Sequence, residues 1–356
     1  MDRPVIALTM GDPSGNGPEL SLKALCGGRY DGRANVIVIG DLRVMLNARR
    51  ILHLEDELEL RGISTPGEAK FAKGVVNVLD LGLFDDISRL RIGQVDALSG
   101  RAAFLSVRKA IELAMAKEVD ATVTNALNKE AMNLALEEAD GSFSDGIRHF
   151  DGHTEIYAHY TGTKSYCMML MHHDLRVSHV STHCSLREAC DRVRKERVLE
   201  VVRLTDRALH DMGLGRVRIA VAGLNPHAGE HGLFGHEEID EIIPAIEAAK
   251  AEGIDAVGPL PPDSVFSEAL GGLYDAVIAM YHDQGHIPLK TVGFVYDRDK
   301  GAWKALEGVN VTLGLPIIRT SVDHGTGFAL AGSGKSDETS LVNAIDAAIS
   351  FAKGRR

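Results

Sequence analysis

Short apolar runs alternate along the chain with longer segments whose apolar residues recur at helical spacing. The runs are rich in Val, Ile and Leu and have the length of buried strands. In the first part of the chain they predict strands at residues 5–10, 36–39, 75–79 and 121–124. The intervening segments predict helices at residues 18–25, 100–117 and 129–136. Such alternation predicts an α/β fold with a mostly parallel sheet covered by helices.

The alternation continues in the second part of the chain after a polar break at residues 138–151, which predicts an exposed loop or a change of domain. Beyond the break, the pattern predicts strands at residues 167–171, 175–180, 217–224, 275–280, 309–315 and 317–322, and a strand and loop at 256–263. It predicts helices at residues 153–160, 186–212, 237–252 and 336–353. The charged residues 295–307, which include Trp303, predict a surface excursion. A two-lobed molecule with a cleft between the lobes is the simplest arrangement.

The composition narrows the possible partners and the compartment. The chain has 356 residues and a formal net charge of −11 without a run of Lys and Arg, so nucleic acid is not expected as a partner. Four cysteines without a Cys-x-x-Cys pair predict reduced thiols and a cytoplasmic protein. The N-terminus lacks a signal-peptide pattern, and no apolar run reaches the ~20 residues of a membrane helix. No association with a membrane is therefore expected.

Three histidines, His183, His227 and His282, each follow an apolar run that predicts a buried strand. Each is expected on a short loop of Gly, Pro, Ser or Asp residues, at the edge of the sheet where ligands gather in open α/β folds. Three imidazoles delivered there predict a divalent metal site that the substrate completes. An ordinary hydrogen-bonded histidine is the alternative for each one alone, and it is the expectation for His149, His159, His172, His210 and His236. Asp283, next to His282, can orient an imidazole or act near the metal.

Two further segments predict anion binding. Residues 152–155, Gly-His-Thr-Glu, open a predicted helix whose first N–H groups favour an anion, and His153 and Thr154 can add donors. An ordinary cap made by Thr154 or Asp151 is the alternative. Arg319 follows an apolar run and is expected to be partly buried, where a phosphate or carboxylate suits its guanidinium. A salt bridge to a carboxylate of the protein is the alternative.

Lys290 and Asn310 join Arg319 as a cationic and amide set in the last third of the chain. Residues 323–332 are mostly small, which permits close backbone approach to a flat or phosphorylated ligand, with a tight surface turn as the alternative. Residues 334–336 resemble the tail of a phosphate-binding loop, but Ala329 stands where that loop requires an earlier glycine. Residues 15–17 lack the third glycine of a dinucleotide-binding fingerprint.

Six motifs occur in an order that resembles the 4-hydroxythreonine-4-phosphate dehydrogenase family over nearly the whole chain. They are Thr-Met-Gly-Asp-Pro-Ser-Gly-Asn-Gly-Pro-Glu (9–19), Gly-His-Thr-Glu (152–155), Asn-Pro-His-Ala-Gly-Glu (225–230), Gly-Pro-Leu-Pro-Pro-Asp (258–263), Tyr-His-Asp-Gln-Gly (281–285) and Asn-Val-Thr-Leu-Gly-Leu-Pro-Ile-Ile-Arg-Thr-Ser-Val-Asp-His-Gly-Thr (310–326).

The resemblance implies a two-domain α/β fold like that of isocitrate and isopropylmalate dehydrogenases. Residues 1–135 and 308–356 would form the cofactor-side domain, and residues 136–307 the metal-binding and dimerisation domain. It implies a homodimer with the active site in the interdomain cleft, and a divalent metal (Zn, Mg, Mn or Co) whose ligands come from both subunits. The implied roles are metal ligation by His183, His227 and His282, substrate binding by His153, Thr154, Lys290, Asn310 and Arg319, and binding of NAD, or NADP, by His324, Gly325 and Thr326. Lys290 and Asp283 are the candidate catalytic residues, with a neighbouring histidine or metal-bound water as the alternatives to Lys290 as proton acceptor.

Residues 225–235 and 282–290, with His286 among them, resemble the branch that acts on 4-phosphorylated D-threonate and D-erythronate. That branch implies an oxidative-decarboxylating dehydrogenase, which oxidises the C3 hydroxyl and then releases CO2 to give dihydroxyacetone phosphate. The alternatives are 4-hydroxy-L-threonine-phosphate dehydrogenase of pyridoxal phosphate synthesis and a related dihydrodiol dicarboxylate dehydrogenase. Two other classes, a non-catalytic binder of phosphorylated acids and a hydrolase that uses the same histidines, do not account for the redox-family motifs.

Overall fold

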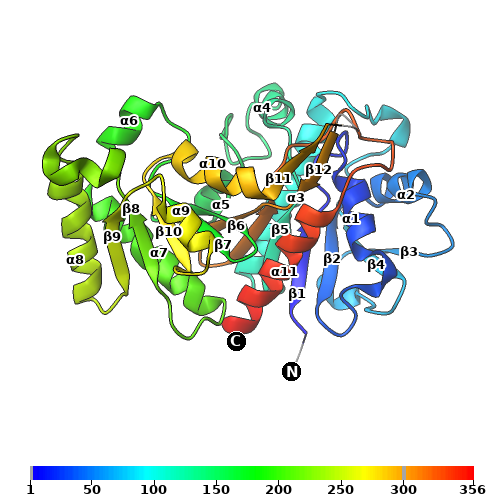
Figure 1. The fold of residues 1–356 in the computed structure, drawn as a ribbon. Helices are drawn as coiled ribbons and strands as arrows, with labels where there is room; N and C mark the ends of the chain where they lie inside the picture. The colour runs from blue at the N-terminus through cyan, green and yellow to red at the C-terminus, as the bar shows by residue number, and fades with distance from the viewer. Residues whose placement is uncertain (1–2, 299–301) are drawn as a thin grey trace. The chain divides into compact units, whose positions relative to one another are not determined.

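The structure is a computed structural model that describes residues 3–298 and 302–356 (Figure 1). They form two compact units, unit 1 with Met1–Thr163 and Leu315–Ala352, and unit 2 with Lys164–Gly314 and Lys353–Arg356. The chain passes from unit 1 to unit 2 after residue 163 and returns after residue 314. Crossings after residues 135 and 307 were expected. In the predicted break, residues 139–151 are irregular. They stay in unit 1, because the following helix is bonded there: the Tyr157 hydroxyl donates to Thr122 Oγ1 at 2.9 Å.

Unit 1 contains a sheet in which every pairing is parallel. The strand order is β3-β4-β2-β1-β5-β14. The strands are β1 (Val5–Thr9), β2 (Asn35–Gly40), β3 (Glu59–Ile63), β4 (Val75–Asp80), β5 (Ala121–Thr124) and β14 (Ile318–Val322). The helices are α1 (Gly17–Leu25), α2 (Leu42–Ile51), α3 (Ala97–Met115), α4 (Lys129–Glu138), α5 (His153–Thr161) and α11 (Thr339–Gly354). The mostly parallel α/β fold predicted from the sequence is confirmed; β3 and α2 were not predicted.

The core of unit 1 forms where α3 packs on β1 and β2. Phe104 of α3 is fully buried and belongs to the same hydrophobic cluster as Ile37 and Ile39 of β2 and Tyr157 of α5. Strand β1 is buried on both faces, since Ile6, on one side, and Ala7, on the other, are both 0 % exposed. Burial of both faces is typical of a parallel sheet covered by helices. It explains why these strands are continuous apolar runs in the sequence.

The segment between β1 and α1 forms a buried turn around Asp12, which is 1 % exposed. Asp12 Oδ1 accepts the Ser14 amide at 2.8 Å, whereas Oδ2 has no hydrogen-bond partner among the described residues. Burial therefore raises the pKa of Asp12 to about 6, against the opposing effect of the Ser14 and Asn128 amides. Asn125, just beyond β5, braces the same turn, because its Nδ2 donates to the Thr9 carbonyl at 3.0 Å.

Unit 2 contains strands in the order β13-β6-β7-β10-β8-β9. Strand β6 is antiparallel to β13 and β7, and the pairings from β7 onward are parallel. The strands are β6 (Cys167–His172), β7 (Leu175–His179), β8 (Ile219–Ala222), β9 (Ala256–Leu260), β10 (Ala276–Ala279) and β13 (Val309–Leu313). The helices are α6 (Leu186–Asp191), α7 (Lys195–Asp211), α8 (Ile243–Ala251), α9 (Val265–Leu270) and α10 (His282–Gly293).

Two helix predictions in unit 2 require correction. The single helix predicted at 186–212 is wrong: α6 and α7 are separated by Arg194, which has extended φ and ψ of −124° and 144°. The helix predicted at 237–252 begins with a π-helical turn, Glu238–Ile242, before α8. Pro244 has no N–H to donate to the carbonyl four residues earlier, so a regular α-helical hydrogen bond is lost at this point.

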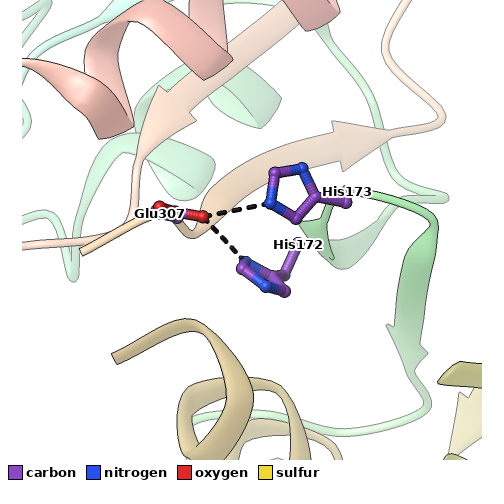
Figure 2. A group of neighbouring side chains, drawn as sticks. All are labelled: His172, His173 and Glu307. Carbon is purple, nitrogen blue, oxygen red and sulfur yellow. Dashed lines mark hydrogen bonds and ion pairs between the residues drawn. The ribbon is translucent and has the colours of Figure 1, made fainter. Parts of the chain in front are cut away.

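The excursion expected at 295–307 begins and ends as an antiparallel pair, β11 (Phe294–Asp297) and β12 (Ala302–Leu306). Its tip, residues 299–301, and the side chain of Trp303 lie outside the described part. Nearby, β6 and β7 are joined by a tight turn at His173 and Asp174, where Glu307 lies beside the turn histidines (Figure 2). No helix formed by residues 3–298 or 302–356 is both long and apolar enough to cross a membrane.

Gly100 permits the close packing of α3 on α4. A Cβ at this position would lie 2.1 Å from the Ala131 carbonyl oxygen, a backbone atom that cannot rotate away. Gly100→Ala is expected to lower the free energy of unfolding by about 2–3 kcal/mol, because α3 and α4 must separate. Urea unfolding measures this loss. Gly67→Ala is the control, because a Cβ there meets no atom within 4 Å; a similar loss in both variants would contradict the packing argument.

Asp12 makes a pH-dependent contribution to stability. The pKa of Asp12 is raised to about 6 in the folded chain, whereas an aspartate in the unfolded chain has a pKa of about 3.9. Between these two pH values, the folded chain keeps a proton on Asp12 that the unfolded chain has released. The contribution is therefore lost as the pH rises from about 4 to about 6. Asp12→Asn keeps the Oδ1 acceptor and is expected to be more stable than the parent at pH 7.5 by up to about 3 kcal/mol, with the difference vanishing near pH 4.

Urea unfolding at both pH values tests this prediction, with Asp41→Asn as the comparison. Asp41 is also fully buried, but its carboxylate accepts the amides of Arg43, Val44 and Phe84. Asp41→Asn is expected to be destabilising at pH 7.5, because it replaces a charged acceptor of these three amides with a neutral one. A stability gain for Asp12→Asn that is the same at both pH values would contradict the assignment.

Candidate functional site

A buried cation lies on β14 of unit 1. Arg319 is 3 % exposed, and its Nη2 donates to Thr124 Oγ1 on the neighbouring strand β5 at 3.0 Å. Its guanidinium carbon lies 5.6 Å from the centre of the Tyr157 ring on α5. Burial lowers the pKa of Arg319 to about 10, while Tyr157 and Glu155 oppose the shift. The guanidinium is therefore charged at neutral pH, and a buried cation of this kind favours an anionic ligand.

The start of α5 adds further positive potential. The helix begins at His153 after Gly152, and no side-chain cap is formed there, so the alternative of an ordinary cap by Thr154 or Asp151 is not observed. A helix start of this kind favours an anion. A Cβ on Gly152 would lie 3.4 Å from Lys129 Cε, 3.6 Å from a Glu155 carboxylate oxygen and 3.8 Å from Lys129 Nζ, so the Lys129 ammonium and the Glu155 carboxylate are both close to the helix start.

His153 connects these groups electrostatically. The residue is half-buried as a whole, but its Nε2 is shielded from solvent and has no hydrogen-bond partner among the described residues. Burial, and then the charges of Arg319 and Lys129, lower the pKa of His153 well below its ordinary value. His153 is therefore a neutral group between two cations. Lys129 was missed from the sequence, although it opens a helix soon after β5, where ligands gather.

The loop predicted to bind the cofactor follows β14 and packs against the first glycine-rich segment. The Asn16 amide donates to the Thr326 carbonyl at 2.9 Å, and a Cβ on Gly15 would lie 2.6 Å from that oxygen. His324 Nδ1 donates to the Gly325 carbonyl at 2.8 Å, which leaves Nε2 as a shielded acceptor without a partner among the described residues. Burial lowers the pKa of His324. A polar edge of a nucleotide can satisfy such an atom.

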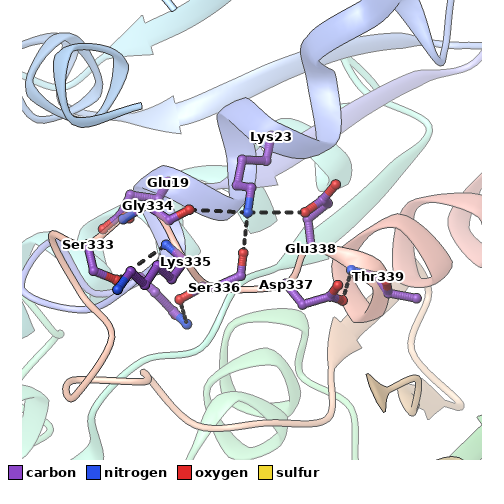
Figure 3. Close-up of polar contacts among 10 residues, drawn as sticks. Glu19, Lys23, Ser333, Gly334, Lys335, Ser336, Asp337, Glu338 and Thr339 are labelled. Carbon is purple, nitrogen blue, oxygen red and sulfur yellow. Dashed lines mark hydrogen bonds and ion pairs between the residues drawn. The ribbon is translucent and has the colours of Figure 1, made fainter. Parts of the chain in front are cut away.

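The next part of the same loop is bound by the protein itself (Figure 3). Glu19 of α1, 2 % exposed, accepts the amides of Gly332 and Gly334 with its two carboxylate oxygens, the latter at 2.7 Å. Lys23, one turn later, donates to the Ser336 carbonyl and lies 3.5 Å from Glu338. Since a carboxylate already accepts the loop amides, residues 334–336 do not form a phosphate-binding loop, which agrees with the absence of the earlier glycine.

In unit 2, a buried amide positions the start of α10. Gln284 accepts the Met280 amide at 2.6 Å and donates to the Gly223 carbonyl at 2.8 Å, so it joins α10 to the ends of β10 and β8. His282 is the first residue of α10, and the short loop expected around it is therefore wrong. Its Nδ1 lies 2.7 Å from Asp283 Oδ1, which orients the ring and leaves Nε2 for a ligand.

Further imidazoles surround His282. The ring of His286 stacks on it at 3.6 Å, the ring of His183 lies at 5.8 Å, and the ring of His179 lies 4.7 Å from His286, all measured between ring centres. Gly285 admits this cluster, because a Cβ there would lie 2.3 Å from His179 Nε2. Burial lowers the pKa of His179 to about 4 and that of His286 to about 2. Neutral imidazoles are the form that binds metal ions.

His227 lies on a strained segment. Five consecutive residues, 227–231, have left-handed φ between 45° and 81°, although only Gly229 is a glycine. Glu238, which is 2 % exposed, holds the start of this loop by accepting the amides of Leu224 and Asn225. The ring of His227 lies 6.4 Å from that of Phe234. Left-handed conformations of non-glycine residues cost about 1–2 kcal/mol each, and such strain is concentrated at functional sites.

The predicted ligands are thus brought together only in part. His183 and His282 approach each other, but within residues 3–298 and 302–356 of this single chain His227 does not join them in a set of ligand atoms within 4.8 Å. The prediction draws ligands from two subunits, so it stays a prediction. Of the other predicted residues in unit 2, Lys290 Nζ lies 5.1 Å from the Phe294 ring centre, and Asn310 Oδ1 on β13 is shielded without a hydrogen-bond partner among the described residues.

Nitrogen donors of this kind fit the predicted divalent metal, because imidazole suits zinc and its neighbours and Asp283 supplies the carboxylate that commonly orients such a ligand. The set that does assemble within 4.8 Å was not predicted: it comprises His172, His173 and Glu307. His172 was expected to be an ordinary histidine, and a pair of adjacent histidines before a turn was the signal that sequence reasoning passed over.

Comparison with known proteins agrees with this architecture. The family of the pyridoxal phosphate biosynthetic protein PdxA matches residues 32–348. A D-threonate 4-phosphate dehydrogenase of Pectobacterium atrosepticum is 46 % identical over 98 % of this chain and 99 % of its own length.

Among solved structures, a 4-hydroxythreonine-4-phosphate dehydrogenase from Klebsiella pneumoniae is 44 % identical with a TM-score of 0.81, over 98 % of this chain and 99 % of its own. A terephthalate 1,2-cis-dihydrodiol dehydrogenase from Burkholderia xenovorans is 27 % identical with a TM-score of 0.66, over 98 % of each chain. These relatives are named dehydrogenases, which confirms the expected oxidoreductase class. The match over most of the chain also confirms the predicted family: the chain belongs to the PdxA family.

Proposed function

We propose that the chain is an NAD-linked dehydrogenase of a 4-phosphorylated four-carbon acid, with D-threonate 4-phosphate as the first candidate and D-erythronate 4-phosphate as the second. The observation that carries the proposal is the buried guanidinium of Arg319 beside the uncapped start of α5, with Lys129 close by. A dianionic phosphate suits this set of donors better than a neutral group does. The relative named D-threonate 4-phosphate dehydrogenase supports the choice of acid.

The residues of unit 1 would hold the phosphate. Arg319 keeps its charge at neutral pH, since the pKa of Arg319, although lowered, is about 10. The neutral imidazole of His153 can give or accept one hydrogen bond without adding charge, and Thr154 adds a hydroxyl in the first turn of α5. Fixing the phosphate fixes the opposite end of a four-carbon substrate, because the molecule is short. The gain is in orientation of the reacting carbon.

The residues of unit 2 would act on the oxidised end. The proposal requires them to contact the same substrate as the phosphate-binding residues. His183, His227 and His282 are the residues assigned to a divalent cation, with the third drawn from a homodimer partner. Such a cation would supply Lewis-acid stabilisation of the substrate oxygens, and NAD beside His324, Gly325 and Thr326 would supply the hydride acceptor.

Side chains of α10 and β13 would transfer the proton and orient the metal ligand and the substrate. Lys290 would accept the C3 hydroxyl proton as the neutral amine. Asp283 Oδ1 lies 2.7 Å from His282 Nδ1 and orients that ring. Asn310 Oδ1 is shielded and without a hydrogen-bond partner among the described residues, so it can accept a hydrogen bond from a substrate hydroxyl. Loss of CO2 from the resulting β-keto acid gives dihydroxyacetone phosphate. The proposed compartment for this reaction is the cytoplasm.

A comparison of substrates tests the proposed function. The purified chain, supplied with Zn²⁺, Mg²⁺, Mn²⁺ or Co²⁺, is assayed with NAD or NADP against D-threonate 4-phosphate, D-erythronate 4-phosphate and 4-hydroxy-L-threonine 4-phosphate. Reduced cofactor and dihydroxyacetone phosphate are measured. D-threonate 4-phosphate with NAD is expected to give the highest kcat/KM. Faster turnover of 4-hydroxy-L-threonine 4-phosphate would favour the alternative that the Klebsiella structure's name suggests, and no cofactor reduction with any acid would refute the proposal.

Arg319→Lys tests the role of the buried guanidinium. Lysine keeps the charge but loses the planar fork that binds a phosphate with two hydrogen bonds. The KM of the phosphorylated acid is expected to rise about 10- to 100-fold, which corresponds to about 1.5–3 kcal/mol for hydrogen bonds to a charged group. Arg216→Lys is the control, since Arg216 is 88 % exposed in a pair with Asp255 at 3.5 Å. An unchanged KM in a folded Arg319→Lys chain would place the phosphate elsewhere.

A further inference from the structure

Three potential metal ligands meet at the turn between β6 and β7. None of them is among the histidines His183, His227 and His282 that are assigned to the family site. His172 ends β6, His173 begins the turn, and Glu307 comes from the segment before β13. One ligand atom from each lies within 4.8 Å of the other two, and Figure 2 shows the two rings directed at the same carboxylate. Neither the substrate nor the cofactor proposal uses any of these side chains.

The fold dictates this meeting. Strand β13 is antiparallel to β6, with Val309 opposite Met171, so two residues further along the register Glu307 falls opposite His173. The Glu307 amide donates to the Gly293 carbonyl at 3.3 Å, which fixes the backbone of Glu307 to the end of α10. Gly293 also makes room for the His172 ring, since a Cβ there would lie 3.0 Å from His172 Nδ1.

The distances between the ligand atoms are close to those of a zinc site. Glu307 Oε2 lies 3.0 Å from His173 Nε2 and 3.8 Å from His172 Nδ1. Two bonds of about 2.0–2.1 Å at a tetrahedral angle separate their ligand atoms by about 3.3 Å. The centres of the two imidazole rings are 4.4 Å apart with the planes inclined at 60°, so both rings can direct a nitrogen at one ion without stacking. The three ligand atoms, which lie within 4.8 Å of one another, are therefore close to the spacing that one ion requires.

Hydrogen bonding alone does not account for the arrangement. His173 can donate to Glu307, but His172 Nδ1 is shielded and has no hydrogen-bond partner among the described residues, although its side chain is only 12 % exposed. His173 occupies a left-handed conformation, φ 50°, at a turn position where glycine is the unstrained choice. A histidine that faces a shared carboxylate, a second imidazole whose Nδ1 makes no hydrogen bond among the described residues, and local backbone strain are expected together at a ligand site.

We propose that His172, His173 and Glu307 bind a divalent metal ion such as Zn²⁺, with water as the fourth ligand. Two imidazoles and one carboxylate are a ligand set that zinc accepts. The ion would connect the β6–β7 turn to the segment that leads into β13, and the backbone of that segment is already bonded to the end of α10. Asn310 and Lys290 lie three residues from these connections, so the site would stiffen the elements that carry them.

Metal content measured on the full chain tests the proposal. Protein stripped with a chelator is dialysed against Zn²⁺, and bound zinc is measured by mass spectrometry and by calorimetric titration. His173→Gln keeps a hydrogen bond to Glu307 but cannot replace the imidazole as a ligand. It is expected to lose one equivalent of zinc, or to weaken that equivalent by at least about tenfold, both in the parent chain and in a His227→Ala background. The second background separates this site from the family site.

His149→Gln is the matched control, because His149 is also exposed and lies 3.3 Å from a carboxylate, that of Asp151. Glu307→Gln provides a second test if His173→Gln does not fold, as judged by circular dichroism. In folded protein of the His227→Ala background, Co²⁺ in place of zinc is expected to give visible absorption bands that His173→Gln and Glu307→Gln remove and His149→Gln retains. Equal zinc content in the parent, His173→Gln and Glu307→Gln chains would overturn the proposal, as would a loss that His149→Gln shares.

Discussion

The burial of one guanidinium is the constraint on which the proposed chemistry of unit 1 depends. Arg319 lies on β14, whose five residues are all buried, and it is 3 % exposed. A cation in such a place is destabilising unless charge or dipoles compensate for its lost hydration. Thr124, the Tyr157 ring and the helix that carries Tyr157 partly satisfy it. The proposed phosphate would add a negative charge beside this cation and beside Lys129.

In unit 2, buried amide and carboxylate side chains join the ends of the strands to the segments that follow them. Gln284 joins β8, β10 and α10, and Glu238 holds the segment that leads to His227. Both groups have satisfied hydrogen bonds, so they can be buried at little cost and act as rigid spacers. The start of the loop that carries His227 and the start of α10, which carries His282, are therefore fixed close to strand ends. Precision of this kind is what a metal ligand or a positioned base requires.

The sequence predicts the fold well where burial is complete. Strand β5 spans the predicted residues, because four consecutive buried residues leave no ambiguity of face. The break between α6 and α7 escaped prediction because the helical spacing of apolar residues continues through it, and Val193 in the break is itself buried. The start of α10 was taken for a loop because Gly285 and Pro288 are typical of loops, whereas here Gly285 admits the His179 ring and Pro288 is tolerated within the helix.

The candidate site was predictable only as far as residue chemistry extends. Arg319, His153 and the anion-favouring helix start were named from local sequence, and the structure brings them together. Lys129 and the pairing of His173 with Glu307, which are 134 positions apart, depend on how helices and strands meet in space. No local pattern encodes such a meeting, because register between distant strands is a property of the folded sheet.

The left-handed turn at residues 227–231 reverses an ordinary rule of protein chemistry. Glycine usually weakens a folded chain, because the unfolded ensemble gains the freedom that folding removes. At Ala228 or His231 a glycine would instead relieve the crowding between Cβ and backbone that L-residues suffer in this region of φ and ψ. The non-glycine side chains at these positions thus make the segment strained, and contacts with the rest of unit 2 must offset that strain. Evolution toward higher stability and evolution toward retained function would therefore choose different residues at the same positions.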